Sequence, residues 1–280
     1  MSNSAEMDPS SHPVTRHSVP DVLAATGTTL SRVADLLTDL PITAWDAPAC
    51  GDWTVDHTAA HLAVGPIAYL EIIDQIAAGT QDQLFDVNDP EFSEAQLIMF
   101  GEAVPQDRID ALRGAFAQFT AGAEQVPQAL WDQVTWTPEG LMPAAAALGI
   151  GLNELTVHEF DIRRAAGLPL QVPSGTDTAL TPFALCALAG LIHQGGWPPL
   201  KLAIEGSAPV LLRWVDRAAE LTKPDQDDPD DLAMLACGPS VLSLLTWQRL
   251  SLADAAKAGL ATVTGTKADV DEVFSACRSF

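Results

Sequence analysis

The segment of residues 153–163 constrains the fold more than any other part of this chain. On a helix that turns about 100° per residue, Glu154, His158 and Asp161 fall on one side, between two arcs of apolar residues. The other polar residues fall on nearly the opposite side and are expected to face solvent: Thr156, Glu159 and Arg163. Because a buried polar group needs a partner, the sequence predicts an inward-facing polar site on a packed helix.

A second predicted helix, residues 54–78, adds two histidines. Its solvent side is indicated by Asp56, Glu71 and Asp74. His57 lies close to that side and is predicted to be a surface residue, whereas His61 lies farther round, toward the apolar side. Asp52 or Thr54 is the expected N-cap.

Two imidazoles and one carboxylate can form a catalytic zinc-type site that keeps an open position. We therefore predict that His61, Glu154 and His158 bind one divalent metal ion, because sites in helical bundles combine side chains from facing helices. Asp161 is predicted to support the site, either by accepting a hydrogen bond from a ligating imidazole or by lying near the open position. The simpler alternative is that a Glu and a His four residues apart belong to a solvated helix face.

The distribution of apolar residues predicts two domains. Four helical stretches indicate a four-helix bundle, and they cover residues 21–40, 54–78, 91–126 and 143–166. Pro105 is expected to break the third stretch, and Gly167 to end the fourth. After residue 168, short β-like runs alternate with helices, which predicts a smaller α+β domain.

The domain boundaries follow from this change of pattern. Residues 1–17 are expected to form a disordered tail, residues 18–170 the bundle, and residues 171–280 the α+β domain. In the latter, the expected helices cover 178–194, 241–249 and 269–277, and the expected strands cover 200–204, 210–214, 232–236 and 260–263. The acidic stretch 223–231 is expected to be an exposed loop.

The composition excludes several classes of partner. The chain of 280 residues carries a formal net charge of -23, so neither nucleic acid nor an anionic membrane surface is an expected partner. Four cysteines without a Cys-x-x-Cys pair favour a reducing cytoplasm over a disulfide framework; they are Cys50, Cys186, Cys237 and Cys277. The first residues lack the apolar core of a secretory signal, and no apolar run reaches the roughly 18 residues that span a bilayer.

Two motifs resemble the signatures of the mycothiol-dependent maleylpyruvate isomerase family, which belongs to the DinB-like metalloprotein superfamily. The first comprises Trp45, Pro48, the run Gly-Asp-Trp-Thr-Val at 51–55, His61 and Leu62. The second comprises Glu154, Leu155, His158, Asp161, Ala165 and Gly167. In that family the matching His, Glu and His bind a divalent metal, usually zinc. The resemblance covers the bundle half and implies the ligands His61, Glu154 and His158.

The C-terminal half is similar to the small α+β domain that accompanies this bundle, which itself resembles a sterol-carrier fold. The similarity rests on Gly238, Pro239, Leu242, Leu245, the run Trp-Gln-Arg at 247–249, Gly259, Val263 and Gly265. Arg249 matches a recurrent arginine of that pattern, which implies a catalytic or cofactor-binding role in holding an anionic substrate or the thiol. The alternative is a surface arginine that caps the C-terminus of its own helix.

The resemblance implies an enzyme that uses a metal ion and mycothiol to act on a small electrophilic substrate. It would be an isomerase if the thiol leaves again and an S-transferase if the thiol stays attached. Cys50 is expected to be structural, because no cysteine of the chain is placed for that chemistry. Two alternatives stay open: a metal-dependent hydrolase or lyase that uses bound water, and a binding protein whose C-terminal domain holds a lipid or another small apolar ligand. The protein is expected to be a monomer or a homodimer.

Overall fold

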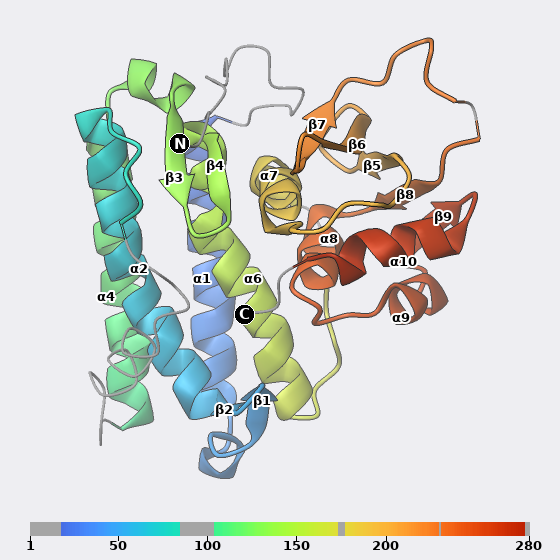
Figure 1. Ribbon diagram of the computed structural model, residues 1–280. Coiled ribbons are helices and arrows are strands. Elements are labelled where there is room, and N and C mark those ends of the chain that lie inside the picture. Colours follow the sequence, from blue (N-terminus) through green and yellow to red (C-terminus); the bar gives the residue numbers. More distant parts are fainter. Residues whose placement is uncertain (1–17, 85–103, 173–176, 230, 278–280) are drawn as a thin grey trace.

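The structure, a computed structural model, describes residues 18–84, 104–172, 177–229 and 231–277 (Figure 1). A helical half and a sheet-containing half lie side by side, in agreement with the predicted fold class. The predicted tail of residues 1–17 and the first part of the predicted third helix, residues 91–103, lie outside the described residues.

Four long helices form the bundle within the described residues: α1 (Val19–Asp39), α2 (Val55–Ala78), α4 (Pro105–Gln125) and α6 (Ile150–Ala165). Helix α2 packs along α4, and α6 packs against both α1 and α2. Their inward side chains are apolar, and Leu37, Leu112 and Leu155 are at most 1% exposed. Because burial of each such side chain stabilises the fold by roughly 1.5–3 kcal/mol, the packing of these apolar faces holds the bundle together.

Local sequence signals set the ends of these helices. Thr54 is the N-cap of α2: its hydroxyl accepts a hydrogen bond from the backbone N–H of His57 at 3.3 Å, and Nδ1 of His57 accepts the backbone N–H of Thr54 at 3.4 Å. Pro105 is the first residue of α4, where the missing N–H of proline costs nothing. Gly167 follows α6 with a φ of 64°, a left-handed conformation that suits glycine.

The predicted solvent face of α6 is wrong. Thr156 and Glu159 are only 4% and 1% exposed. The Glu159 carboxylate pairs with Arg32 of α1 at 2.7 Å and with Arg163 at 2.9 Å. Helix α6 packs on α1, on α2 and on the C-terminal half, so its charged side meets a cation from another helix instead of water. A helical wheel identifies a charged side, but it contains no information about a neighbour that neutralises the charge.

The C-terminal half contains a mixed five-stranded sheet with helices packed on it. The strand order is β7-β6-β5-β8-β9, in which β5 and β8 are parallel and the other neighbours are antiparallel. The strands are β5 (Leu200–Ile204), β6 (Val210–Val215), β7 (Ala218–Thr222), β8 (Met234–Cys237) and β9 (Ala261–Thr264). The helices are α7 (Thr181–Leu191), α8 (Pro239–Thr246), α9 (Leu252–Lys257) and α10 (Lys267–Ser275).

Most predicted elements of this half are confirmed, as strands β5, β6, β8 and β9 and as helices α7, α8 and α10. The sequence does not predict β7 or α9. The turn from β6 to β7 contains Asp216 and Arg217 with φ values of 45° and 74°. Such tight hairpin turns usually carry Asn-Gly or Asp-Gly, so this turn lacks the expected signal.

Two short hairpins of the helical half are also missing from the sequence prediction: β1 (Pro48–Cys50) with β2 (Trp53–Thr54), and β3 (Val134–Thr137) with β4 (Gly140–Pro143). The tip of the β3–β4 hairpin packs against α7 at Gly190. A Cβ atom at Gly190 would lie 1.9 Å from the backbone oxygen of Glu139, so only glycine allows this approach. The contact holds the hairpin tip, and with it Glu139, between the two halves.

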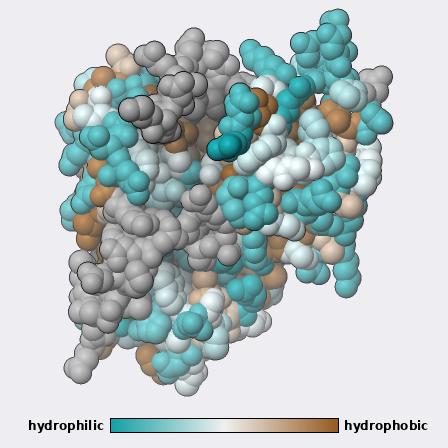
Figure 2. Space-filling view, viewed as in Figure 1, coloured by the Kyte–Doolittle hydropathy of each residue, from teal (hydrophilic) through white to brown (hydrophobic). Residues whose placement is uncertain are grey.

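The two halves share one hydrophobic core, and a second apolar cluster of Val157, Phe160 and Leu244 joins α6 to α8. The domain boundary at residue 170 therefore stays a prediction. Hydrophilic residues cover much of the C-terminal half on the face shown in Figure 2, and the described residues of the 223–231 loop are mostly exposed, as predicted. None of the described helices is both long and apolar enough to cross a membrane.

Candidate metal centre

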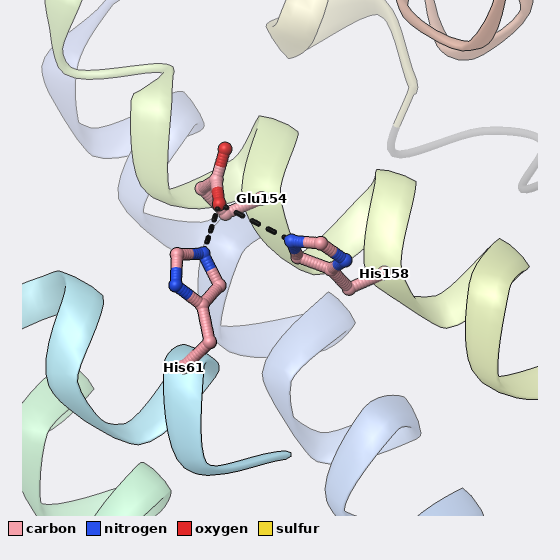
Figure 3. Close-up of side chains that lie close together, drawn as sticks. All are labelled: His61, Glu154 and His158. Carbon is pink, nitrogen blue, oxygen red and sulfur yellow. Dashed lines mark hydrogen bonds and ion pairs between the residues drawn. The ribbon is translucent and has the colours of Figure 1, made fainter. Parts of the chain in front are cut away.

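Helices α2 and α6 bring the three predicted ligands together (Figure 3). One carboxylate oxygen of Glu154, Oε2, lies 3.0 Å from Nε2 of His61 and 3.5 Å from Nε2 of His158. One nitrogen or oxygen atom from each residue lies within 4.8 Å of the other two. Two imidazoles and a carboxylate that converge in this way match the donor set of a site with three protein ligands and an open position.

His57 has a different role. It is partly buried, and its ring closes the first turn of α2 by accepting the backbone N–H of Thr54. The cluster found among the described residues contains His61 and not His57, which agrees with the distinction that the helical wheel predicts. The two histidines are four residues apart, but only one of them faces α6.

The electrostatics of the cluster favour a cation. The exposed fractions of the side chains of His61, Glu154 and His158 are 18%, 15% and 7%. Burial alone would lower the pKa of His158, but hydrogen bonds and charges from Asp161 and Glu154 outweigh it and raise this pKa to about 9. Burial alone would raise the pKa of Glu154, whereas the two imidazoles lower it far below its usual range. The ionised carboxylate therefore attracts positive charge, either a proton on His158 or a metal ion.

Asp161 is fully buried and joins the triad to the C-terminal half. Its Oδ2 atom lies 3.1 Å from Nδ1 of His158 and accepts a hydrogen bond from Nε of Arg249, also at 3.1 Å. Its Oδ1 atom accepts a hydrogen bond from Nη2 of Arg164 at 3.2 Å. Because Asp161 engages Nδ1 of His158, the other ring nitrogen of that histidine is the one that faces Glu154.

Arg249 reaches from the end of α8 into this cluster. Besides Asp161, it donates to the backbone oxygen of Trp247 at 2.9 Å and to Sγ of Cys50 at 2.8 Å. The bond to the Trp247 oxygen is the helix-end contact expected for an arginine that caps its own helix. The bond to Asp161 is the contact expected for an arginine of the site. Both exist together, because a guanidinium has five N–H groups.

Three of the four cysteines are poor nucleophiles, and none of the four forms a disulfide. Burial raises the pKa of the Cys50 thiol, and the opposing effect of Arg249 does not reverse this shift. Burial also raises the pKa values of Cys186 and Cys277 to about 12. Since the thiolate is the reactive form, these three residues are almost wholly in the unreactive form at neutral pH.

Two polar residues next to the triad are missing from the sequence prediction. Burial, and then the charge of Glu154, raise the pKa of the Tyr69 phenol on α2, and the position of Tyr69 eight residues after His61, on the same helix face, was an available signal. Glu139, at the tip of the β3–β4 hairpin, is 6% exposed, and its Oε2 atom has no hydrogen-bond partner among the described residues. Burial, followed by the charge of Glu154, raises its pKa to about 7. No sequence pattern places a hairpin tip beside the bundle.

A helical bundle with a cluster suited to a divalent metal, joined to a sheet-containing half, defines the class of this protein. The family described as "Mycothiol maleylpyruvate isomerase N-terminal domain" matches residues 27–163. This match lies within the helical half of the chain. The matched segment contains His61, Glu154, His158 and Asp161, and it ends before the sheet-containing half.

Solved structures extend the likeness to both halves. The crystal structure of the mycothiol-dependent maleylpyruvate isomerase is 15% identical, with a TM-score of 0.58 over 89% of this chain and 93% of that chain. A mutant of that enzyme with one histidine replaced by alanine gives 14% identity and a TM-score of 0.57 over the same shares. YfiT from Bacillus subtilis is 15% identical, and the comparison covers 57% of this chain and 98% of YfiT with a TM-score of only 0.44. No curated protein sequence matches the chain. The two maleylpyruvate isomerase structures establish the fold. The type of the C-terminal domain, with its sterol-carrier resemblance, stays a prediction.

Proposed function

We propose that this protein is a divalent-metal-dependent enzyme that uses mycothiol, or a similar small thiol, to isomerise or conjugate a small electrophilic anion. The observation that carries the proposal is the convergence of His61, Glu154 and His158, with ligand atoms within 4.8 Å of one another. This cluster lies in the segment that matches the mycothiol maleylpyruvate isomerase N-terminal domain, and the fold likeness covers both halves of the chain.

The residues fit a zinc ion better than a hard cation. Two imidazole nitrogens and one carboxylate oxygen are typical zinc ligands, whereas calcium and magnesium prefer oxygen ligands alone. A metal ion held by these residues would lower the pKa of a bound thiol or water toward neutrality. The partial exposure of His61 and Glu154 leaves the site open on their side.

Asp161 is proposed to orient the metal ligand His158. By accepting the hydrogen bond from Nδ1–H, it fixes the tautomer in which Nε2 carries the free electron pair. It also fixes Arg249, so one carboxylate sets the position of a ligand from the bundle and of a cation from the other half.

Arg249 is proposed to bind the anionic group of the substrate or of the thiol. Three of its five N–H groups are used by Asp161, Trp247 and Cys50, and a guanidinium can bind a carboxylate with two parallel N–H groups. Asp161 neutralises only part of the positive charge of Arg249, since the Asp161 carboxylate is shared with Arg164 and His158. The side chain is 17% exposed, which leaves it accessible from one side.

An external thiol is proposed because the chain's own thiols are unsuited. Burial keeps Cys50, Cys186 and Cys277 protonated. In the proposed reaction the small thiol releases its S–H proton to solvent, its sulfur bonds to one carbon of an activated double bond of the substrate, and the π electron pair moves to the neighbouring carbon as a stabilised carbanion. If this carbanion expels the thiolate after rotation about the former double bond, the double bond forms again, the thiolate regains a proton and the product is an isomer. If the carbanion is protonated instead, the product is a conjugate.

The test has two stages. First, purified protein is assayed for bound zinc, with His158→Ala as the test variant and His193→Ala, an exposed histidine of the C-terminal half, as the control. We expect zinc near one equivalent in the wild type and the control, and a large loss in His158→Ala. Wild-type protein without bound or reconstitutable metal would overturn the proposal.

Second, consumption of maleylpyruvate is followed with and without mycothiol. Dependence on the thiol, lost in His158→Ala, supports an isomerase or transferase. Turnover of electrophilic esters or other substrates without any thiol dependence would instead support the metal-dependent hydrolase. A protein that binds metal but turns over nothing, and that retains lipid in its C-terminal half, would support the binding-protein alternative.

A further inference from the structure

The short hairpin of β1 and β2 lies beside the start of α2 and the end of α6 (Figure 1). Its turn consists of Gly51 and Asp52, and its register pairs Cys50 with Trp53. Gly51 has a φ of 54°, a left-handed conformation that glycine adopts at no steric cost. The turn therefore reverses the chain within two residues and leaves Trp53 one residue before the N-cap of α2.

The indole of Trp53 packs on one of the proposed metal ligands. Its ring centre lies 5.0 Å from that of His61, with the ring planes inclined at 47°. The ring of His61 also meets the ring of His158 edge-on, with centres 5.1 Å apart, and its Nε2 atom lies 3.0 Å from Oε2 of Glu154. The imidazole of His61 is therefore bounded by Trp53 as well as by the two other proposed ligands.

Two arginines hold the first strand of this hairpin. Nη2 of Arg164, in the last turn of α6, donates to the backbone oxygen of Ala49 at 2.8 Å, and Nη2 of Arg249 donates to Sγ of Cys50 at 2.8 Å. Both guanidiniums also bind the carboxylate of Asp161. Ala49 is 4% exposed, so this strand is packed into the molecule. The hairpin is therefore fixed to both halves of the protein.

A metal-ligating imidazole binds best when its ring is held in one orientation, because a ring that turns freely loses that freedom when the metal binds. For His158 the carboxylate of Asp161 holds the ring, at 3.1 Å from Nδ1. For His61 the indole of Trp53 restricts rotation of the ring by direct contact. Aromatic pairs at such distances contribute more than the area that they bury.

We propose that Trp53 is a positioning residue of the metal centre: its indole holds the imidazole of His61 in the ligating orientation, and the anchored hairpin holds the indole. An indole is a donor only and offers no metal ligand, so Trp53 acts through His61. The inference rests on the proposed metal site and deepens it. Asp161 then serves both histidine ligands, His158 by direct contact and His61 through the two arginines that anchor the hairpin.

The first test removes the indole. Zinc affinity is measured by competition with a chelator, and Trp53→Ala is expected to bind zinc roughly 2- to 12-fold more weakly, the contribution of one aromatic pair. Trp53→Phe keeps a ring at this place and should restore most of the affinity. The matched control is Trp214→Ala, which should leave zinc affinity unchanged. Trp214 is also partly buried and pairs with the ring of Trp197 at 6.4 Å, but on the sheet of the C-terminal half.

The second test changes the hairpin and keeps every side chain around the metal. Apart from its chain neighbours, no described atom lies within 4 Å of a Cβ atom built at Gly51, so Gly51→Ala acts only through its φ of 54°. Gly259 is the matched control, with a φ of 71° and equally open surroundings in the C-terminal half. Both variants should lose stability, because an L-residue resists the left-handed conformation, but only Gly51→Ala should weaken zinc binding. Equal zinc affinity in the two variants would overturn the role of the hairpin.

A third measurement observes the contact in the wild type. The chain has seven tryptophans, and the indole N–H NMR signal of Trp53 is assigned by its loss in Trp53→Phe. This signal should shift when zinc binds and when His61→Ala is introduced, whereas the signal of Trp214 should not.

A purely structural role for Trp53 predicts that Trp53→Ala loses stability while its zinc affinity stays that of the wild type. That result, or a Trp53 signal that does not respond to zinc, would overturn the positioning role and leave the metal site intact. A wild type that binds no zinc would overturn both the positioning role and the proposed function.

Discussion

The two halves of this molecule place charge differently. In the helical half, α6 carries Glu154, His158, Glu159 and Asp161 with side chains that are at most 15% exposed, and each is paired with a charged or polar partner. In the other half, the strands fill the core with apolar residues, and acidic residues gather on the exposed loop after β7. Buried charge costs stability unless it is paired. The helical half, which keeps paired charges buried, is also the half that contains the proposed metal site.

The two patterns meet at Asp161 and Arg249. Arg249 is the charged side chain of the C-terminal half that enters the buried network of α6, at 3.1 Å from Asp161. The apolar cluster of Val157, Phe160 and Leu244 lies at the same junction. The junction therefore combines hydrophobic packing with a charge pair, and changes to that pair should affect both the fold and the site.

The largest effect is expected for Asp161→Asn. The variant keeps the shape of the side chain but removes the charge that Arg164, Arg249 and His158 share. Because it leaves Arg249 and His158, which are 17% and 7% exposed, without their charged partner, we expect a loss of about 3–5 kcal/mol in the free energy of unfolding, measured by chemical denaturation. The control is Asp74→Asn on the exposed side of α2. A loss below about 1 kcal/mol, as for surface ion pairs, would show that the buried network is not what distinguishes the helical half.

A gain of stability is expected for Glu139→Gln. The buried carboxyl of Glu139 has an oxygen without a partner among the described residues and a pKa raised from 4.5 to about 7. The folded state therefore favours the protonated form. The stability that the protonated Glu139 carboxyl contributes is fully present below about pH 4.5 and is lost as the pH rises to about 7. The amide is neutral throughout, so the variant avoids that loss.

The measurement is the unfolding free energy of both proteins in the presence of a chelator, between pH 4.5 and pH 8. The difference in favour of Glu139→Gln should grow up to about pH 7 and reach at most roughly 3 kcal/mol. Besides burial, the charge of Glu154 raises the pKa of Glu139, whereas its own backbone and Thr137 lower it. A constant difference across this pH range would show that Glu139 is ionised in the folded protein and that an unseen partner neutralises it.

The sequence predicts the elements that local chemistry determines. The helical periodicity identifies α1, α2 and α6, and the alternation of β-like runs with glycine identifies most of the sheet. The same periodicity selects His61 over His57 and groups Glu154 with His158 and Asp161, and the structure brings the three predicted ligands together. In these cases the information lies within about two helical turns, a distance over which a wheel is valid.

The elements that the sequence does not predict depend on contacts between distant segments. Glu159 has the pattern of a solvent residue, but Arg32, 127 residues away, makes its burial possible. Glu139 enters the site because Gly190 allows the β3–β4 tip to approach α7. Strand β7 follows a turn of Asp216 and Arg217 that has no glycine. Each case requires knowledge of a tertiary neighbour that periodicity does not contain.

The smallest effects are expected at two helix caps, one in each half. Thr54 caps α2, which carries His61, and Ser251 caps α9 of the C-terminal half by accepting the backbone N–H of Asp254 at 3.0 Å. Replacing either by alanine should cost about 1 kcal/mol in the free energy of unfolding. Only Thr54→Ala should also weaken zinc binding, because loosening the first turn of α2 lets His61, two turns later, move relative to Glu154. An equal change of zinc affinity in Ser251→Ala would mean that the C-terminal half shapes the metal centre as strongly as the bundle does, and that the division of roles between the halves is incorrect.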